Sequence, residues 1–176
     1  MSTGAAKMSV YVGEKFACVR ISGRANFASS VDFKTLITDL RQKGYSYFVL
    51  DLTECGLMDS TFLGLLAGFG IKLNTSQKDS CAPAIELVNT NPRIMELLES
   101  LGVSHLFRFA NGPLGSVPAG EPCTQAPSSP SKEEVTRACL EAHQTLMQLN
   151  PQNAARFKDV AAFLAENLNK PKPSSA

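Results

Sequence analysis

The chain has 176 residues and a hydrophobic content of 44%, which suits one domain of ordinary size or a small domain with an appendage. Its 17 Lys and Arg residues against 16 Asp and Glu residues leave a formal net charge of +1. This balance argues against a nucleic-acid binder or a protein drawn to an anionic membrane, because both need a concentrated basic surface. No apolar run approaches the roughly 20 residues of a membrane-spanning helix, and the first residues lack the apolar stretch of a secretion signal. We therefore expect a cytoplasmic protein that does not insert into a membrane.

The first part of the chain alternates between strand and helix patterns. Two short segments rich in β-branched residues, separated by a turn at Gly13, predict an opening hairpin. Ser29 and Ser30 predict the cap of a first helix, and the continuous apolar run 47–52 predicts a strand buried on both faces. A loop over 53–58 leads to the second helix. In chain order we expect strands at 8–12 and 16–22, a helix at 31–43, a strand at 47–52, a helix at 61–73, a strand at 84–88, a helix at 92–101 and a strand at 106–109.

This order, β-β-α-β-α-β-α-β, predicts an α/β fold with a mixed, mostly parallel sheet. Strands that alternate with helices are joined by right-handed crossovers and therefore run parallel. The opening hairpin supplies an antiparallel edge. Because the predicted apolar helix stripes number only three, we expect the helices mainly on one face of the sheet.

Composition changes sharply after the last of these strands. Residues 111–131 are dominated by Pro, Gly and Ser, which predicts an extended linker. Ser131 and Glu134 then form a capping box that predicts a helix start, and Asn150 followed by Pro151 predicts the start of another helix. The predicted units are a domain at 1–110, a linker at 111–131 and a two-helix extension at 132–176. A linker of this composition favours a loosely tethered helical hairpin, and tight docking on the domain is the alternative.

Ser60 lies where the loop after the buried strand meets a strongly apolar helix. One interpretation is that the serine caps the helix, since its hydroxyl can accept an unpaired backbone N–H. The other is that it carries a phosphate, because a helix N-terminus has free N–H groups and a positive dipole. Asp59 beside it would oppose the added negative charge, which suits a site whose phosphorylation changes binding.

The sequence predicts no catalytic, cofactor or metal site. Its five cysteines include no C-x-x-C pair, so a structural zinc site or a thioredoxin-type centre is not supported. Gly64, Gly68 and Gly70 lie inside the predicted second helix without a following Gly-Lys-Ser/Thr, so they do not form a phosphate-binding loop. Close packing of that helix on the sheet is their ordinary explanation. We expect a protein that is not an enzyme.

The segment 50–64, LDLTECGLMDSTFLG, has a strand, a loop, an Asp-Ser pair and a helix start. This pattern resembles the STAS domain, the fold of bacterial anti-sigma factor antagonists. The segments 16–26, 84–101 and 105–109 also resemble parts of that domain, so the resemblance covers roughly residues 8 to 109. The Asp-Ser pair at the start of the second helix is its most specific element.

The resemblance implies a binding protein switched by phosphorylation, which regulates transcription or stress signalling. An unphosphorylated antagonist of this family binds an anti-sigma factor that is also a serine kinase of the histidine-kinase-like ATPase fold. Phosphorylation releases the antagonist, and a PP2C-type phosphatase restores the serine. Ser60 matches the phosphorylated serine, and Thr61 is an alternative acceptor. The resemblance places Asn26, Asp59, Ser60, Thr61 and Phe62 on the partner-binding surface.

Two of these residues differ from the family pattern. Asn26 stands where an aspartate is usual near the kinase contact, and we expect its turn beside Ser60 because two strands end on the same rim. Phe62 stands where a glycine is common, and it either fills a core pocket or projects toward the partner, burial being the commoner outcome for phenylalanine. These differences leave an alternative function, a constitutive STAS-type cytoplasmic subunit of an ABC-type lipid transporter.

Overall fold

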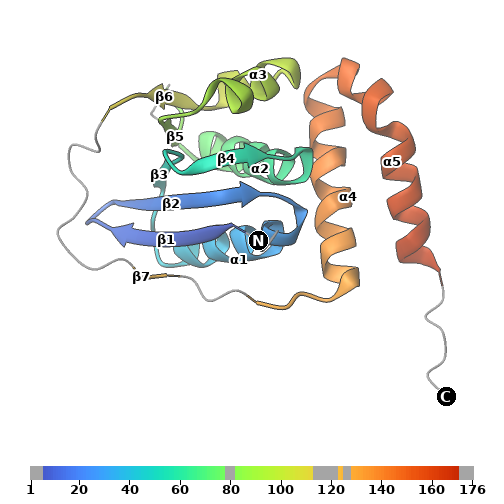
Figure 1. The fold of residues 1–176 in the computed structure, drawn as a ribbon, viewed down its shortest axis with the longest axis horizontal. Helices are drawn as coiled ribbons and strands as arrows, with labels where there is room; N and C mark the ends of the chain where they lie inside the picture. The colour runs from blue at the N-terminus through green and yellow to red at the C-terminus, as the bar shows by residue number, and fades with distance from the viewer. Residues whose placement is uncertain (1–5, 78–81, 113–122, 125–127, 171–176) are drawn as a thin grey trace.

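The computed structural model describes residues 6–77, 82–112, 123–124 and 128–170. Figure 1 shows the arrangement of its helices and strands. The strands are β1 (Lys7–Val12), β2 (Phe16–Ala25), β3 (Tyr47–Asp51), β4 (Cys55–Met58), β5 (Ile85–Val88), β6 (Arg108–Ala110) and β7 (Cys123–Thr124). The helices are α1 (Phe27–Gln42), α2 (Ser60–Ser76), α3 (Pro92–Ser100), the 3-10 turn η1 (Ser104–Leu106), α4 (Lys132–Leu149) and α5 (Pro151–Asn169).

The described strands form one mixed sheet in the order β6-β5-β3-β2-β1-β7, with β4 paired to β2. The β1–β2 hairpin is antiparallel, and the β2–β3, β3–β5 and β5–β6 pairs are parallel. Helices α1 and α2 lie together behind the sheet in Figure 1. The predicted fold class, a mixed and mostly parallel sheet with helices mainly on one face, is confirmed.

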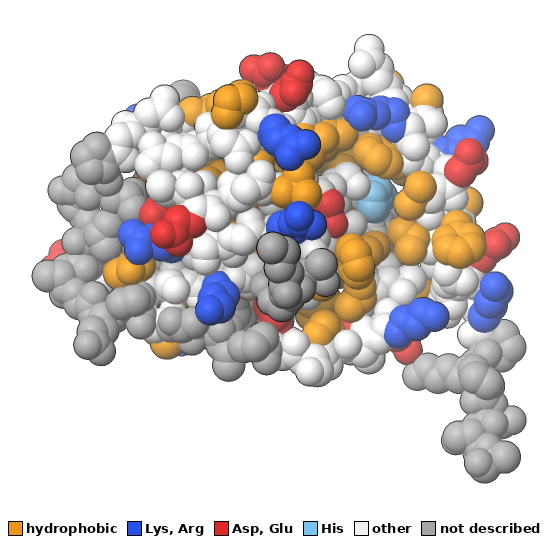
Figure 2. Space-filling view, in the orientation of Figure 1, with side chains coloured by type: hydrophobic (Ala, Val, Ile, Leu, Met, Phe, Trp, Pro, Cys, Tyr) orange, Lys and Arg blue, Asp and Glu red, His pale blue; other side chains and the backbone are white. Residues whose placement is uncertain are grey.

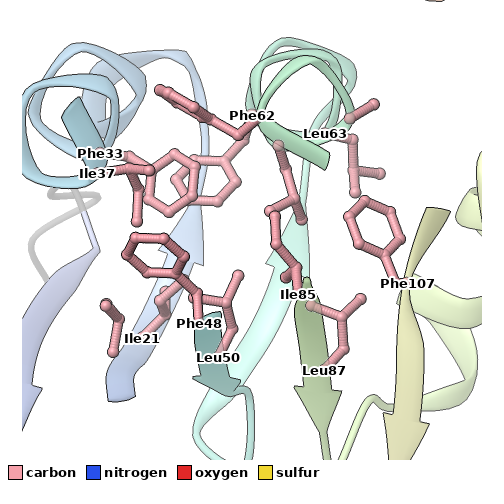
Figure 3. Packing of buried hydrophobic residues seen from close by; sticks show 14 of the residues in the cluster. Ile21, Phe33, Ile37, Phe48, Leu50, Phe62, Leu63, Ile85, Leu87 and Phe107 are labelled. Atoms are coloured by element: carbon pink, nitrogen blue, oxygen red, sulfur yellow. The ribbon is translucent and has the colours of Figure 1, made fainter. Parts of the chain in front are cut away.

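The core lies between this sheet and helices α1 and α2 (Figure 3). The ring of Phe33 from α1 meets the ring of Phe62 from α2, with their centroids 4.5 Å apart. Apolar side chains of three neighbouring strands fill the space beneath them. The buried residues of this layer include Ile21, Phe33, Ile37, Phe48, Leu50, Phe62, Leu63, Ile85, Leu87 and Phe107.

Two short strands lie where the sequence predicts none. Strand β4 lies within the predicted loop 53–58 and runs parallel to the end of β2, whose register shifts between Gly23 and Arg24. Strand β7 lies within the predicted linker and pairs antiparallel with β1. Such short strands depend on pairing with a distant strand rather than on a pattern of their own. Most of the remaining linker, residues 113–122 and 125–127, lies outside the described residues.

The C-terminal helices pack against the domain rather than standing away from it. Figure 1 shows α4 across the ends of the α1–α2 layer, with α5 beyond it. Leu146 of α4 is fully buried in the main core cluster. Asn153 of α5 is also buried, and its side-chain amide donates to the carbonyl oxygens of Leu101 and Leu146 at 2.9 Å each. The expectation of a loosely tethered hairpin is therefore wrong, because linker composition carries no information about the face that α4 contacts.

The outer side of this helical pair is apolar in part. Figure 2 shows hydrophobic side chains gathered over the part of the molecule that α4 and α5 occupy. Two hydrophobic residues of α5, Val160 and Phe163, are 43% and 61% exposed. The start of α5 is thus buried against both α4 and the domain, while these two later residues stay exposed.

Candidate functional site

Ser60 is the first residue of α2, close to the carboxyl end of β4. The helix cap is the preceding residue, since Oδ1 of Asp59 accepts the backbone N–H of Phe62 at 2.9 Å. The expectation that Ser60 caps the helix is therefore wrong, because Asp59 performs that task. The hydroxyl of Ser60 makes its contact with α4 instead.

Asp59 also joins the starts of helices α1 and α2. Its Oδ2 accepts the N–H of Phe27, the first residue of α1, at 2.7 Å. Its own N–H donates to the carbonyl oxygen of Ala25 at 3.0 Å. One carboxylate thus lies at the positive ends of two helices, where a negative charge is stabilised. The expectation that the Asn26 turn lies beside Ser60 is confirmed by these contacts.

Asn26 caps α1, which begins at Phe27. Its Oδ1 accepts the N–H of Ala28 at 3.1 Å, and the hydroxyl of Ser29 accepts the N–H of Asn26 at 3.1 Å. This reciprocal capping box starts the helix four residues earlier than predicted, so the assignment of Ser29 and Ser30 as caps is wrong. The Asn26 side chain holds a helix start, and its contact with a partner stays a prediction.

Replacing Asn26 by alanine should lower the free energy of unfolding by about 1 kcal/mol, because the Ala28 N–H loses its acceptor. Asn26→Asp is the matched control, since aspartate caps about as well, and its effect should stay below about 0.5 kcal/mol. Urea unfolding of the full chain measures both values. Equal losses for the two variants would contradict the capping role.

The two residues after Ser60 are turned away from solvent. Phe62 is fully buried against Phe33, so it belongs to the core, and its assignment to the partner-binding surface is wrong. Its aromatic ring finds more apolar contact between α1 and the sheet than solvent would offer. Thr61 is 5% exposed, and its hydroxyl donates to Sγ of Cys139 in α4 at 3.5 Å.

The hydroxyl of Ser60 lies 3.0 Å from Nε2 of His143 in α4. The other ring nitrogen, Nδ1, lies 2.6 Å from the carbonyl oxygen of Cys139. Because a carbonyl oxygen can only accept, Nδ1 carries the proton. When Nε2 carries no proton, it accepts a hydrogen bond from the Ser60 hydroxyl.

His143 is the functional residue that the sequence analysis missed. Its side chain is 6% exposed and lies edge-on to the ring of Phe157 in α5, with a centroid distance of 5.0 Å. It stands 83 positions from Ser60, outside the segments that resemble the STAS domain. The sequence did hold one signal for His143. It follows Ala142 on the apolar side of the predicted helix, where a polar side chain needs a hydrogen-bond partner.

A separate polar group closes the end of β3. Oδ2 of Asp51 accepts from Nε of Arg20 at 2.9 Å, and Oδ1 accepts from the N–H and the hydroxyl of Thr53 at 3.1 and 2.5 Å. Burial opposes the ionisation of Asp51 most strongly, but the hydrogen bonds from Thr53 and Arg20 together outweigh it. They hold the pKa of Asp51 below its usual range. The carboxylate is thus satisfied within the domain and serves its structure.

The reactive group that this arrangement offers is the hydroxyl of Ser60, which lies at the positive N-terminal end of α2. The described residues include no group of three or more His, Cys, Asp or Glu side chains that could hold a metal ion. None of the described helices combines the length and the apolar character needed to cross a membrane.

A family model described as the STAS domain matches residues 7–113 of the chain. An Anti-sigma-B factor antagonist of Staphylococcus aureus (strain NCTC 8325) is 27% identical over 99 residues, which make up 56% of this chain and 87% of that protein. Helices α4 and α5 lie beyond the part that the family model matches.

Two solved structures share the fold. SpoIIAA of Bacillus, an anti-sigma factor antagonist solved in its unphosphorylated form, has a TM-score of 0.51 and 16% identity over 60% of this chain and 88% of that chain. An anti-sigma factor antagonist from Mycobacterium paratuberculosis has a TM-score of 0.51 and 16% identity over 62% of this chain and 88% of that chain. At such identities the likeness is one of fold.

Proposed function

Because this chain belongs to the STAS domain family, we propose that it acts as an anti-sigma factor antagonist. In its unphosphorylated form it binds an anti-sigma factor, and phosphorylation of Ser60 releases it. The names of the relatives support the first step, and release on phosphorylation is what the resemblance to the family implies. The observation that carries the proposal is the place of Ser60, the first residue of α2 directly after the shared cap Asp59.

A phosphate at this position would change both the charge of the site and its contact with α4, because the Ser60 hydroxyl lies 3.0 Å from Nε2 of His143. The phosphate adds a charge of about −1.5 to −2 at neutral pH. The N-terminus of α2 attracts that charge, while the carboxylate of Asp59 next to it opposes it. The domain can therefore tolerate the phosphate, and a partner fitted to the neutral hydroxyl meets a strongly negative site.

The proposed partner is an anti-sigma factor that is also a serine kinase of the histidine-kinase-like ATPase fold. A PP2C-type phosphatase would return Ser60 to its unmodified state. The chain is the substrate of both enzymes and acts in the cytoplasm as a binding module, without a catalytic step, cofactor or metal of its own. Thr61 is the second candidate acceptor, and its burial under α4 makes Ser60 the better substrate.

Ser60→Ala should bind the anti-sigma factor and stay bound when ATP is present, whereas Ser60→Glu should bind at least roughly tenfold more weakly through charge repulsion. Ser46→Glu is the charge-matched control. Ser46 is exposed and lies just before β3, at the end of the sheet opposite to the rim that carries Ser60. Calorimetric titration of each variant measures the affinity. Equal affinity for the Ala and Glu variants of Ser60 would sink the proposal.

The second candidate is a constitutive cytoplasmic subunit of an ABC-type lipid transporter. The hydrogen bond between Ser60 and the buried His143 favours it, because a hydroxyl held inside the protein can serve structure alone. Under this function the Ser60 variants change partner affinity little, and the chain copurifies with a membrane transporter rather than with a kinase.

A further inference from the structure

We infer that the face formed by α1 and α2 beside Ser60 is a helix-binding surface for the protein partner, and that α4 occupies it until the partner replaces it. The inference rests on the proposed function, since it concerns the surface beside Ser60 that the anti-sigma factor would bind. The partner it fits is a protein that presents an α-helix with small side chains and an acidic residue. Helix α4, which lies on this face now, shows which chemistry the face accepts.

Helices α2 and α4 approach each other closely at Gly64. A Cβ atom added at Gly64 of α2 would lie 2.5 Å from the carbonyl oxygen of Ala142 in α4. The prediction that Gly64 packs on the sheet is wrong, because this glycine meets α4. Leu65 of α2 completes the contact with Ala138 and Ala142, two small residues of the same helix. The face therefore accepts a helix only where that helix carries small side chains.

Polar contacts surround this apolar centre and end at Ser60. Lys34 of α1 pairs with Glu141 of α4, and both side chains are about 40% exposed. Thr61 contacts Cys139, and Ser60 contacts His143, as described above. Ser60 and Thr61, the two candidate phosphate acceptors at the start of α2, are therefore both in contact with α4. Ser60 is half-buried, and α4 covers the side of it that faces His143, so a partner helix on this face would have to replace α4.

The C-terminal end of α4 is anchored to the domain, so the form in which α4 covers the α1–α2 face is the main population of the free chain. Leu146 is fully buried, and the Asn153 amide ties the start of α5 to the carbonyl oxygens of Leu101 and Leu146. The competent form is thus a minor population of the free chain. The apparent affinity for the partner equals the intrinsic affinity multiplied by the fraction of chains in the competent form. Release of α4 should therefore raise the apparent affinity.

Two glycines of α2 provide a matched pair of variants in the full chain. Gly64→Ala should push α4 away, because its Cβ meets backbone atoms that cannot yield. Gly68→Ala, one turn further along, places its Cβ 3.8 Å from the Thr145 side chain, which is ordinary contact. Hydrogen exchange should therefore accelerate in α4 and in the first turn of α2 for Gly64→Ala and stay unchanged for Gly68→Ala.

The opposite manipulation locks α4 in place. In Thr61→Cys the new thiol lies close to the native thiol of Cys139, whose sulfur is 3.5 Å from the Thr61 hydroxyl, so oxidation should join α2 to α4. The double variant Thr61→Cys, Cys139→Ser cannot form this bond and controls for the oxidant. The binding probe is the anti-sigma factor retained by Ser60→Ala in the experiment above.

Gly64→Ala should bind this anti-sigma factor roughly tenfold or more tightly than wild type and Gly68→Ala. Oxidised Thr61→Cys should lose binding and regain it on reduction. The double variant should bind the anti-sigma factor equally well under oxidising and reducing conditions. Equal binding by oxidised and reduced Thr61→Cys would overturn the inference and leave the proposed function standing. So would faster exchange in Gly64→Ala without a gain in affinity. An anti-sigma factor that binds neither wild type nor any variant would overturn both.

Discussion

Phe62→Ala should lower the free energy of unfolding by about 3 to 5 kcal/mol, the usual range for removing a fully buried phenylalanine. The ring fills the space between α1 and the sheet and stacks on Phe33 at 4.5 Å. Its removal loses apolar burial and leaves a cavity that the two helices cannot close. A loss of this size is a large part of the stability of an ordinary domain, so the variant should also accumulate poorly in cells.

Phe163→Ala is the control for this substitution. Its ring is 61% exposed on α5, so the same change of side chain should cost less than about 0.5 kcal/mol. Urea unfolding of both variants, followed by circular dichroism, gives the two values. A Phe62→Ala loss as small as that of the control would place Phe62 on the surface and revive its assignment to partner binding.

Asp51→Ala should lower the free energy of unfolding by about 1 to 2 kcal/mol at neutral pH, because the buried carboxylate accepts three hydrogen bonds from donors that stay partly exposed to solvent. The Arg20 guanidinium and the N–H and hydroxyl of Thr53 all donate to this carboxylate. Asp39→Ala is the control, since Asp39 forms only an exposed ion pair with Lys43 and its loss should cost less than about 0.5 kcal/mol.

The same carboxylate predicts a pH dependence of stability. The folded protein holds the pKa of Asp51 below that of the unfolded chain, so the unfolded state binds the proton more readily. The contribution of Asp51 is therefore fully present above the unfolded pKa of about 3.9 and is lost as the pH falls through the lower, folded pKa. Wild type should lose more stability than Asp51→Ala over that acidic range. Parallel losses, measured by urea unfolding, would contradict the structural ion pair.

The sequence was sufficient to predict the sheet and the three helices of the domain. Residues 47–52 form a continuous apolar run, and Asn91-Pro92 marks a helix start by side-chain chemistry alone. These signals are local, and the structure confirms the strand and helix order that they predict. Strand β4 carries no such signal, because its four residues depend on the end of β2 as a partner.

The candidate site was predictable in its position but not in its surroundings. Asp59 and Ser60 adjoin a predicted helix start, so their place on the rim follows from local patterns. The cover provided by α4 does not, because it depends on contacts across more than 70 positions between Ser60 and His143 and between Thr61 and Cys139. The role of Gly64 was missed for the same reason, since a glycine inside a helix does not reveal which neighbour comes close.

Ser60 is central to the proposed switch, as the phosphorylated residue that controls partner binding. The direct measurement is phosphopeptide mass spectrometry over residues 57–72, made on the complex with the anti-sigma factor before and after addition of ATP. We predict one phosphate, on Ser60, that appears as the complex dissociates, and neither phosphate nor dissociation for Ser60→Ala. Dissociation with Ser60 unmodified, or a Ser60→Ala complex that dissociates as fast as wild type, would contradict it.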